Sequence, residues 1–214
     1  MQQFIGLPGS GGIAIGPAWI YHPQQVKVDR TTVQDTALEW ESLQTAMSMA
    51  RQQLVSLEAR ANEMVGPEEA AIFGAHLMFL DDEELLDSLK NMIIAKHLNA
   101  KAAIHDAFGY YAEALLGLEE EYFKARAQDV TDVGQRVLRC LEGALDVPST
   151  KLVKPSIILA EDLTPSDTIQ FDREMILGIA TVKGGPTSHT AILARALGVP
   201  AIVSVPLDLD DILP

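Results

Sequence analysis

The clearest pattern in the chain is a run of apolar residues spaced alternately three and four positions apart. Its members are Trp40, Leu43, Met47, Ala50, Leu54, Leu57, Ala61 and Met64. This spacing places the side chains on one face of a helix over more than three heptads. The dipeptide Gly66-Pro67 interrupts the pattern, because proline cannot continue a helix interior. The sequence therefore predicts one long helix that ends before Gly66.

Further helical patterns follow this helix and extend to about residue 143. The second runs from Ala70 to Leu80. Residues whose side chains accept hydrogen bonds from the free N–H groups of a helix start then mark three more beginnings, at Asp81-Asp82, Asn99 and Asp129. Short loops between helices imply antiparallel neighbours, so this region is expected to form an all-helical bundle.

A different pattern occupies both ends of the chain. Residues 1–21 combine five glycines with short apolar runs, and we interpret them as two strands joined by a glycine turn. After Val147, the apolar runs 157–159, 175–180 and 200–203 have the length of strands and alternate with helical segments. Such alternation is typical of an α/β unit.

Together these patterns predict an α/β domain with an inserted antiparallel helical bundle, a combination of α/β and all-α parts. The expected α/β domain comprises residues 1–21 and 145–214, and the expected helical domain comprises residues 22–144. The sequence ends at Pro214 shortly after a strand and without a closing element, so we expect a truncated C-terminal edge in the α/β domain.

Composition narrows the classes of protein and partner. The 214 residues are 48% hydrophobic and 21% charged, as in ordinary globular proteins. No apolar run approaches the roughly 18 residues that span a bilayer. The first residues also lack the basic segment of a secretory signal. The single cysteine, Cys140, excludes an internal disulfide and is expected to be buried and inert. We therefore expect a cytoplasmic protein.

The net charge of −14 disfavours nucleic acid and anionic membranes as partners, because both attract basic surfaces. A basic protein partner is compatible with this charge. Acidity that only keeps the protein in solution is compatible with it as well, and charge alone does not separate the two interpretations.

The candidate chemistry lies in Gly184–Arg195, with the sequence GGPTSHTAILAR. A glycine turn, which allows close backbone approach, precedes His189 in the first turn of a predicted helix. Free N–H groups and the dipole at a helix start favour an anion, and neutral imidazole is a competent nucleophile. Two interpretations stay open: a histidine that carries a phosphoryl group, and one that only caps or packs.

Other motifs contribute less. Gly9–Ala14 superficially fits a dinucleotide-binding fingerprint, but Pro17 follows in place of a helix start, so we interpret the segment as a turn. No His-x-x-x-His or cysteine-rich spacing predicts a metal site. His76 lies in an apolar helix beside an acidic turn, which leaves a core residue and an interface residue equally open.

The chain resembles the phosphoenolpyruvate-utilising enzymes, because residues 184–203 are similar to their phosphohistidine signature. Within that group it resembles the N-terminal part of Enzyme I, the phosphotransferase of the bacterial sugar phosphotransferase system. This narrower resemblance rests on residues 6–16, 68–73, 76, 79–85, 126–130 and 162–168. The implied fold is a swivelling phosphohistidine α/β domain with an inserted helical bundle.

The resemblance implies roles around the histidine. His189 would accept a phosphoryl group from phosphoenolpyruvate through Nε2, and Thr168 would hydrogen-bond the imidazole in the resting state. The residues expected to support the phosphate are Gly184, Gly185, Thr187, Ser188 and Thr190. Pro186 departs from the family, in which an arginine or another polar residue often follows the glycine pair.

The resemblance also implies that the helical bundle docks HPr, a small histidine phosphocarrier protein. Acidic and apolar residues of the bundle would meet a basic rim on the carrier, in keeping with the negative net charge. The expected docking face consists of Glu68, Ala71, His76, Phe79, Asp82, Glu84, Leu115 and Arg126.

In the family, phosphoenolpyruvate and Mg²⁺ bind a C-terminal barrel domain that we expect to be absent here, so no cofactor or metal is expected in this chain. It should exchange a phosphoryl group with phosphorylated HPr without reacting with phosphoenolpyruvate alone. It should also be monomeric, whereas the full-length enzyme would be a homodimer. Two alternatives stay open: an Enzyme I-like module of a fused phosphotransferase, such as that serving dihydroxyacetone kinase, and a partner-binding module whose His189 is never phosphorylated.

Overall fold

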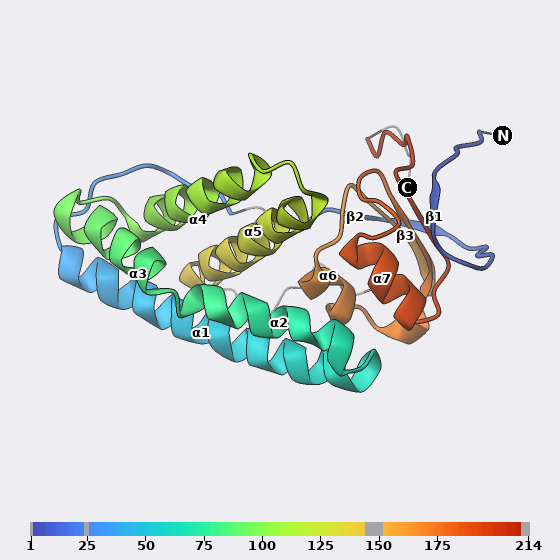
Figure 1. Cartoon of the computed structure of the whole chain (residues 1–214), viewed down its shortest axis with the longest axis horizontal. Coiled ribbons are helices and arrows are strands. Elements are labelled where there is room, and N and C mark those ends of the chain that lie inside the picture. Colours follow the sequence, from blue (N-terminus) through green and yellow to red (C-terminus); the bar gives the residue numbers. More distant parts are fainter. Residues whose placement is uncertain (1, 24–25, 144–151, 211–214) are drawn as a thin grey trace. The chain divides into compact units, whose positions relative to one another are not determined.

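The computed structural model describes residues 2–23, 26–143 and 152–210, and the chain divides into two compact units (Figure 1). The α/β unit comprises residues 1–24, 59–70 and 147–214, and the helical unit comprises residues 25–58 and 71–146.

The assignment of residues 59–70 to the α/β unit differs from the boundaries expected from the sequence. A hydrogen bond joins this segment to the rest of the α/β unit. Nη2 of Arg60, near the end of the first long helix, donates to the carbonyl of Phe171 at 3.2 Å.

The α/β unit is built on a sheet that has, within the described residues, five strands in the order β1-β5-β4-β3-β2. The strands are β1 (Leu7–Ser10), β2 (Ala18–Tyr21), β3 (Ser156–Ala160), β4 (Ile176–Thr181) and β5 (Ala201–Val203). Neighbouring strands from β2 to β5 are parallel, and β1 is antiparallel to β5. Helix α6 (Pro165–Gln170) and a 3₁₀ turn at Arg173–Met175 connect β3 to β4, and α7 (His189–Ala196) connects β4 to β5.

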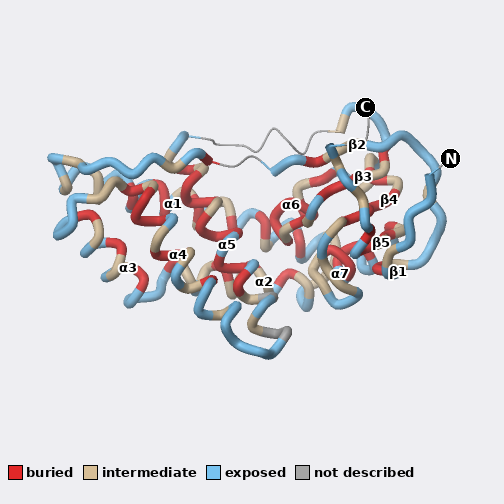
Figure 2. The backbone as a smooth tube through the Cα atoms, turned by 90° about the horizontal axis from the view of Figure 1, so that it is seen from above, coloured by how far each residue is buried: buried red, intermediate tan, exposed pale blue. Residues whose placement is uncertain are grey.

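Both faces of this sheet are apolar. Successive strand residues point to opposite sides, and β3 and β4 consist largely of consecutive apolar residues. One face contributes Ile158 and Ile179 to a core that also contains Ala194 of α7. The opposite face carries a smaller cluster with Leu159 and Ala180. The buried positions along the strands are visible in Figure 2. The helices α6 and α7 therefore rest on a fully packed layer.

The two N-terminal strands lie at opposite edges of the sheet, so they do not pair with each other. The segment 11–17 between them is a crossing connection and not a tight turn. It passes β4 closely, since a Cβ on Gly178 would come within 2.9 Å of the Ala14 Cβ. The sequence indicated two strands here correctly, but it did not indicate their separation.

Helices make up the helical unit. Those described are parts of α1 (Thr36–Met64) and α2 (Pro67–Leu80), followed by α3 (Glu83–Lys90), α4 (Ala100–Leu116) and α5 (Glu121–Leu141). A π-helical turn at Asn91–Ala95 extends α3. The apolar seam predicted for α1 is buried at six positions: Leu43, Met47, Ala50, Leu54, Leu57 and Ala61. The long helix predicted from periodicity is thus confirmed.

Two predicted helix starts are confirmed by their capping hydrogen bonds. The N–H of Leu85 donates to Asp82 Oδ1 at 2.8 Å, and the N–H of Ala102 donates to Asn99 Oδ1 at 2.8 Å. At the start of α6, Thr164 forms a reciprocal capping box with Asp167. These short polar side chains satisfy N–H groups that have no partner within their helix.

The predicted helix start at Asp129 is wrong. Helix α5 begins at Glu121, and Asp129 lies fully buried near its middle. Its carboxylate accepts a hydrogen bond from Arg126 Nη1, one turn earlier, at 2.9 Å. An aspartate in a helix interior is therefore explained here by an ion pair inside the helical unit.

A search for membrane-spanning segments among the described residues found no helix with the necessary length and apolar character.

Candidate functional site

The candidate site lies where the segments after β3, β4 and β5 come together. The N–H of Lys183 donates to the carbonyl of Glu161 at 2.8 Å, which joins the segments after β4 and β3. The N–H of Val205 donates to the carbonyl of Thr181 at 3.0 Å, which joins β4 to the segment after β5. In open α/β sheets, ligands bind at this carboxyl edge of parallel strands.

Residues 184–188, called here the signature turn, leave this edge and lead into α7. Gly184 has a φ of +91°, a left-handed conformation that favours glycine. A Cβ at this position would also lie 3.2 Å from Ser188 Oγ. The N–H of Ser188 donates to the carbonyl of Gly185 at 2.9 Å and closes the turn. Gly185 is half-buried, whereas Thr187 is exposed.

His189 is the first residue of α7, and its side chain is half-buried. Ser188 caps the helix, because its Oγ accepts a hydrogen bond from the N–H of Ala191. Thr190 is buried and donates from Oγ1 to the carbonyl of Leu163 at 3.2 Å, which fixes the helix start against the segment that precedes α6. His189 therefore lies at the positive end of the α7 dipole, directly after a capped helix start.

Thr168 lies fully buried on α6, a helix that packs against α7. Its Oγ1 donates to the carbonyl of Thr164 at 3.1 Å. The predicted hydrogen bond between Thr168 and the His189 imidazole stays a prediction.

Arg195 is a residue whose role sequence reasoning missed. Its Nη1 donates to the carbonyl of Gly9 at 2.6 Å and to the carbonyl of Pro186 at 2.9 Å. The guanidinium therefore ties the signature turn to β1. The sequence did carry a signal for this role, because Arg195 is the basic residue in the last turn of the predicted His189 helix. An arginine can donate hydrogen bonds to several acceptors at once and so can join two segments.

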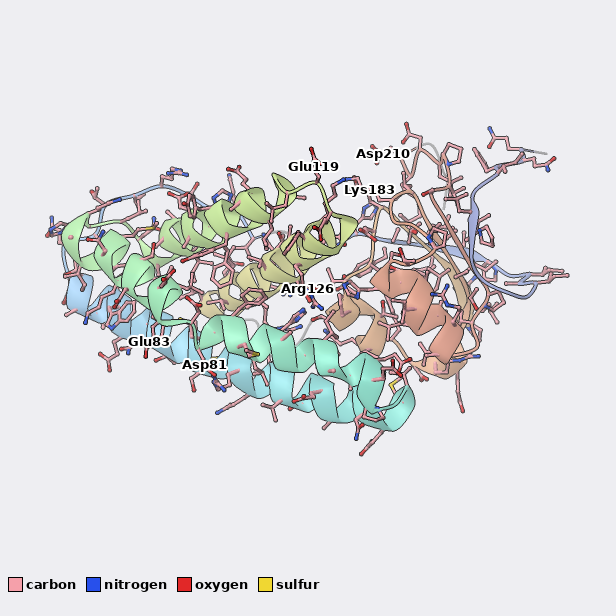
Figure 3. The ribbon with its side chains drawn as sticks, viewed as in Figure 1. Asp81, Glu83, Glu119, Arg126, Lys183 and Asp210 are labelled. Carbon is pink, nitrogen blue, oxygen red and sulfur yellow. The ribbon has the colours of Figure 1, made fainter. Side chains whose placement is uncertain are left out.

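An exposed ion pair stands next to the turn, with Lys183 Nζ 2.7 Å from Glu161 Oε1. The hydrogen bond and charge of Lys183 lower the pKa of the Glu161 carboxyl. The same contact raises the pKa of Lys183, and the charge of Asp162 adds to that rise. Figure 3 shows Lys183 on the loop after β4. Both side chains are open to solvent, so this pair contributes little to stability.

In the part of the chain that the structure describes, no three His, Cys, Asp or Glu side chains gather closely enough to hold a metal ion.

The helical unit carries most of the predicted docking residues. Asp82 and Glu84 are exposed at the start of α3, in the acidic turn where Figure 3 labels Asp81 and Glu83. Burial, followed by the charges of Asp82 and Glu84, raises the pKa of Tyr111 on α4. Helix α3, which begins at this acidic turn, packs against α4. Leu115, one helical turn after Tyr111, is half-buried.

Helix α2 contributes the remaining surface positions of the predicted face. Ala71 is exposed and Phe79 is half-buried. Glu68 is exposed in the first turn of the same helix.

The prediction that His76 contributes to a docking surface is wrong, because its side chain is completely buried in the helical unit. Its Nε2 lies 3.4 Å from Asp129 Oδ1, and its Nδ1 lies 3.9 Å from Asp132 Oδ2. Phe73, one turn earlier on α2, packs edge-on against the ring. Arg126, labelled in Figure 3, is half-buried, and its Nη1 donates to Asp129 Oδ2.

Comparison with known sequences identifies two family regions. Residues 5–126 match the sequence profile of the family described as PEP-utilising enzyme, N-terminal. Residues 152–212 match the profile described as PEP-utilising enzyme, mobile domain.

Curated relatives include the phosphoenolpyruvate-protein phosphotransferase of Geobacillus stearothermophilus. It is 39% identical over 198 residues, which cover 92% of this chain and 34% of the relative. The protein of the same name from Bacillus subtilis (strain 168) is 36% identical over 204 residues, with coverage of 95% and 36%. The chain thus spans about a third of the length of these curated relatives.

Two solved structures are similar in fold. One is a solution structure of Enzyme I (nEIt), with 36% identity, a TM-score of 0.76, and coverage of 95% of this chain and 83% of that chain. The other is the N-terminal domain of Enzyme 1 - Nitrogen, with 27% identity, a TM-score of 0.65, and coverage of 96% and 85%. The predicted fold class and the resemblance to the N-terminal part of Enzyme I are confirmed.

Proposed function

The chain belongs to the PEP-utilising enzymes, and from this we propose that it carries the phosphohistidine of a phosphoryl relay. His189 receives a phosphoryl group that originates from phosphoenolpyruvate and passes it to a histidine of HPr. The observation that carries this proposal is the position of His189 at the start of α7, directly after the signature turn. The curated relatives named phosphoenolpyruvate-protein phosphotransferase support the proposal.

The reaction with phosphoenolpyruvate belongs, in this proposal, to a part of the longer relatives that this chain does not cover. The chain matches only about a third of their length. The step for which it supplies the residues is the exchange of a phosphoryl group between His189 and HPr.

This exchange is an in-line transfer between two imidazole rings. A ring nitrogen of neutral His189 attacks phosphorus while the P–N bond to the carrier's histidine breaks with its electron pair. One proton leaves the His189 ring and the carrier's ring takes one up, so both rings end neutral. Such a transfer needs positioning and charge stabilisation more than further covalent chemistry.

The start of α7 provides both. The positive end of the helix dipole lies at this start and favours a negatively charged group on His189. Ser188 and Thr190 hold this start by the hydrogen bonds of their hydroxyl groups. These bonds hold the backbone around His189 in place.

The imidazole has to move for the reaction through Nε2. In the structure the Nε2 atom is buried, although the side chain as a whole is half-buried. Attack requires the nitrogen and the phosphorus to come within about 3–3.5 Å of each other. The proposal therefore requires a movement of the His189 imidazole that exposes this atom.

HPr docks, in this proposal, on exposed and half-buried residues that combine acidic and apolar side chains with one arginine. They are Glu68, Ala71, Phe79, Asp82, Glu84, Leu115 and Arg126. Acidic groups attract a basic carrier and speed its approach, while apolar groups bury surface in the complex. His76 is left out of this face because it is buried.

The test is to mix the chain with HPr phosphorylated on its histidine and to follow the intact masses of both proteins. We expect the chain to gain one phosphoryl group, and the His189→Ala variant to gain none while keeping the circular dichroism spectrum of the wild type. A wild-type chain that binds phosphorylated HPr but takes no label would contradict the proposal and favour a partner-binding module.

A further inference from the structure

Ser204, the residue directly after β5, has an uncommon backbone conformation. Its φ is +54°, in the left-handed region that favours glycine. Among the described residues other than glycine, only His97 shares a positive φ. Such conformations persist where the surrounding structure holds them in place, and they concentrate at functional sites. The interactions of Ser204 therefore indicate what holds this conformation.

The side chain of Ser204 is directed at the signature turn. Its Oγ donates to the carbonyl of Gly184 at 2.5 Å. On one side, the N–H of Val205 is fixed to the carbonyl of Thr181 at the end of β4. On the other side, Thr181 Oγ1 donates to the carbonyl of Lys183 at 2.8 Å, just before Gly184. Hydrogen bonds thus fix the segments that follow β4 and β5 to each other, and they keep Ser204 Oγ within reach of the Gly184 carbonyl.

The signature turn has a second fixed point close to His189. Arg195 donates to the carbonyl of Pro186, three residues before the histidine. The turn is therefore held at Gly184 from the β5 side and at Pro186 from α7. Of these two contacts, only the one at Gly184 depends on a residue in a strained conformation.

We infer that Ser204 is a positioning residue for the phosphoryl chemistry of His189. Its hydroxyl fixes the carbonyl of Gly184 and so keeps the signature turn in the shape that sets His189 and the adjacent N–H groups toward a phosphoryl group. The inference rests on the proposed transfer function of His189. Ser204 forms no bond to phosphorus and exchanges no proton in the reaction.

Two substitutions separate positioning from a purely structural role. Ser204→Ala removes the hydroxyl and keeps a side chain in the left-handed conformation. Ser204→Gly also removes the hydroxyl but relieves the conformational strain, which offsets part of the lost stability. If Ser204 only stabilised the fold, the transfer rate of each variant would decrease in proportion to the loss of its thermal stability. Ser204→Gly would then transfer nearly as fast as the wild type.

The experiment measures the rate of phosphoryl transfer from phosphorylated HPr to the whole 214-residue chain, together with the melting temperature of each variant. We expect both variants to transfer about two- to tenfold more slowly, the effect of losing one net hydrogen bond. We also expect Ser204→Gly to melt at a higher temperature than Ser204→Ala. In nitrogen-15 spectra, the imidazole resonances of His189 should shift or broaden in both variants.

Ser156→Ala is the matched control. The hydroxyl of Ser156 also donates to a carbonyl, that of Lys154 at 3.0 Å, but it lies at the amino end of β3, away from the carboxyl edge of the sheet. This variant should transfer at the wild-type rate.

A Ser204→Gly variant with the wild-type transfer rate and unchanged His189 resonances would overturn the inference. It would also be overturned if Ser156→Ala slowed transfer as much as the two Ser204 variants. A wild-type chain that takes no label contradicts the proposed function itself, and the inference falls with it. The two failures are thus distinguished by the wild-type measurement.

Discussion

His76 and His189 differ in what surrounds their imidazole rings. His76 is enclosed in the helical unit beside the carboxylates of Asp129 and Asp132. His189 is half-buried at a helix start, directly after a glycine turn. A nucleophile needs access to its substrate. The side chain of His189 is partly open to solvent although its Nε2 atom is buried, whereas the complete enclosure of His76 suits a structural role.

The structural role of His76 predicts a large loss of stability on its removal. His76→Ala leaves a cavity and deprives buried carboxylates of a neighbour, so we expect a loss of about 2–4 kcal/mol in the free energy of unfolding. Urea denaturation measures this loss. His105→Ala is the control, because His105 is exposed and should change the free energy by less than about 0.5 kcal/mol. Equal effects of the two substitutions would contradict the proposed role of His76.

Cys140 predicts a dependence of stability on alkaline pH. Burial raises the pKa of its thiol, and the charges of Arg136 and Arg139 offset part of that rise. With a raised folded pKa, its stability contribution is complete below the unfolded value of about 8.5 and is lost as pH rises through the folded pKa. Melting temperatures should therefore fall less steeply between about pH 8 and pH 10 for Cys140→Val than for the wild type. Parallel pH profiles would count against this effect.

At the scale of the elements, the packing of α4 against α5 depends on a glycine. A Cβ on Gly134 would lie 2.9 Å from both Cβ and Cγ of Phe108. The absence of a side chain at Gly134 lets the two helices approach closely at this point. By contrast, Gly109 on α4 has open space where a Cβ would stand.

These two glycines predict opposite effects of the same substitution. Gly134→Ala should destabilise the chain by about 1–3 kcal/mol, because the added methyl group overpacks the α4–α5 contact. Gly109→Ala should stabilise it by about 0.5–1 kcal/mol, because alanine favours the helix and meets no neighbour. Thermal or urea unfolding of both variants checks the pair. A stabilising Gly134→Ala would show that the helices pack less closely than described.

The positions of many helices could be predicted from the sequence, because the periodicity of apolar residues and the capping residues are local signals. The seam of α1 and the caps at Asp82, Asn99 and Thr164 are of this kind. Asp129 misled the prediction because an aspartate can either cap a helix or pair inside one, and only the packed neighbours distinguish the two. The burial of His76 was open for the same reason.

The strand order and two of the site contacts could not be predicted from local signals. Strands β1 and β2 are close in sequence but pair with β5 and β3, which come more than 100 residues later. The contacts of Arg195 with Gly9 and of Ser204 with Gly184 exist only once these strands are placed. By contrast, the motif around His189 is contiguous, so the sequence alone indicated the candidate nucleophile.

At the scale of the whole molecule, the net charge of −14 bears on the partner. A large net charge on one protein attracts an oppositely charged partner over a longer distance, and added salt weakens this attraction. The proposed docking face contains exposed Glu84, which is not a capping residue of α3. Its charge can therefore be changed without removing the helix cap at Asp82.

Reversing this charge should slow the encounter with HPr. We expect Glu84→Lys to lower kcat/KM for transfer from phosphorylated HPr about tenfold at low salt, and the difference from wild type to shrink as salt is added. Glu41→Lys makes the same change in net charge at an exposed position of α1 outside the proposed face. If both variants were slowed equally, the negative charge would act through the whole molecule and not through this face.

The central claim is that His189 carries a phosphoryl group that it exchanges with a histidine of HPr. Phosphorus-31 NMR of the chain mixed with phosphorylated HPr tests it most directly. The account predicts a phosphoimidazole signal on the chain that disappears when excess unphosphorylated HPr is added, and that never forms in His189→Ala. A signal that persists in His189→Ala, or a wild-type chain that shows none, would contradict the account.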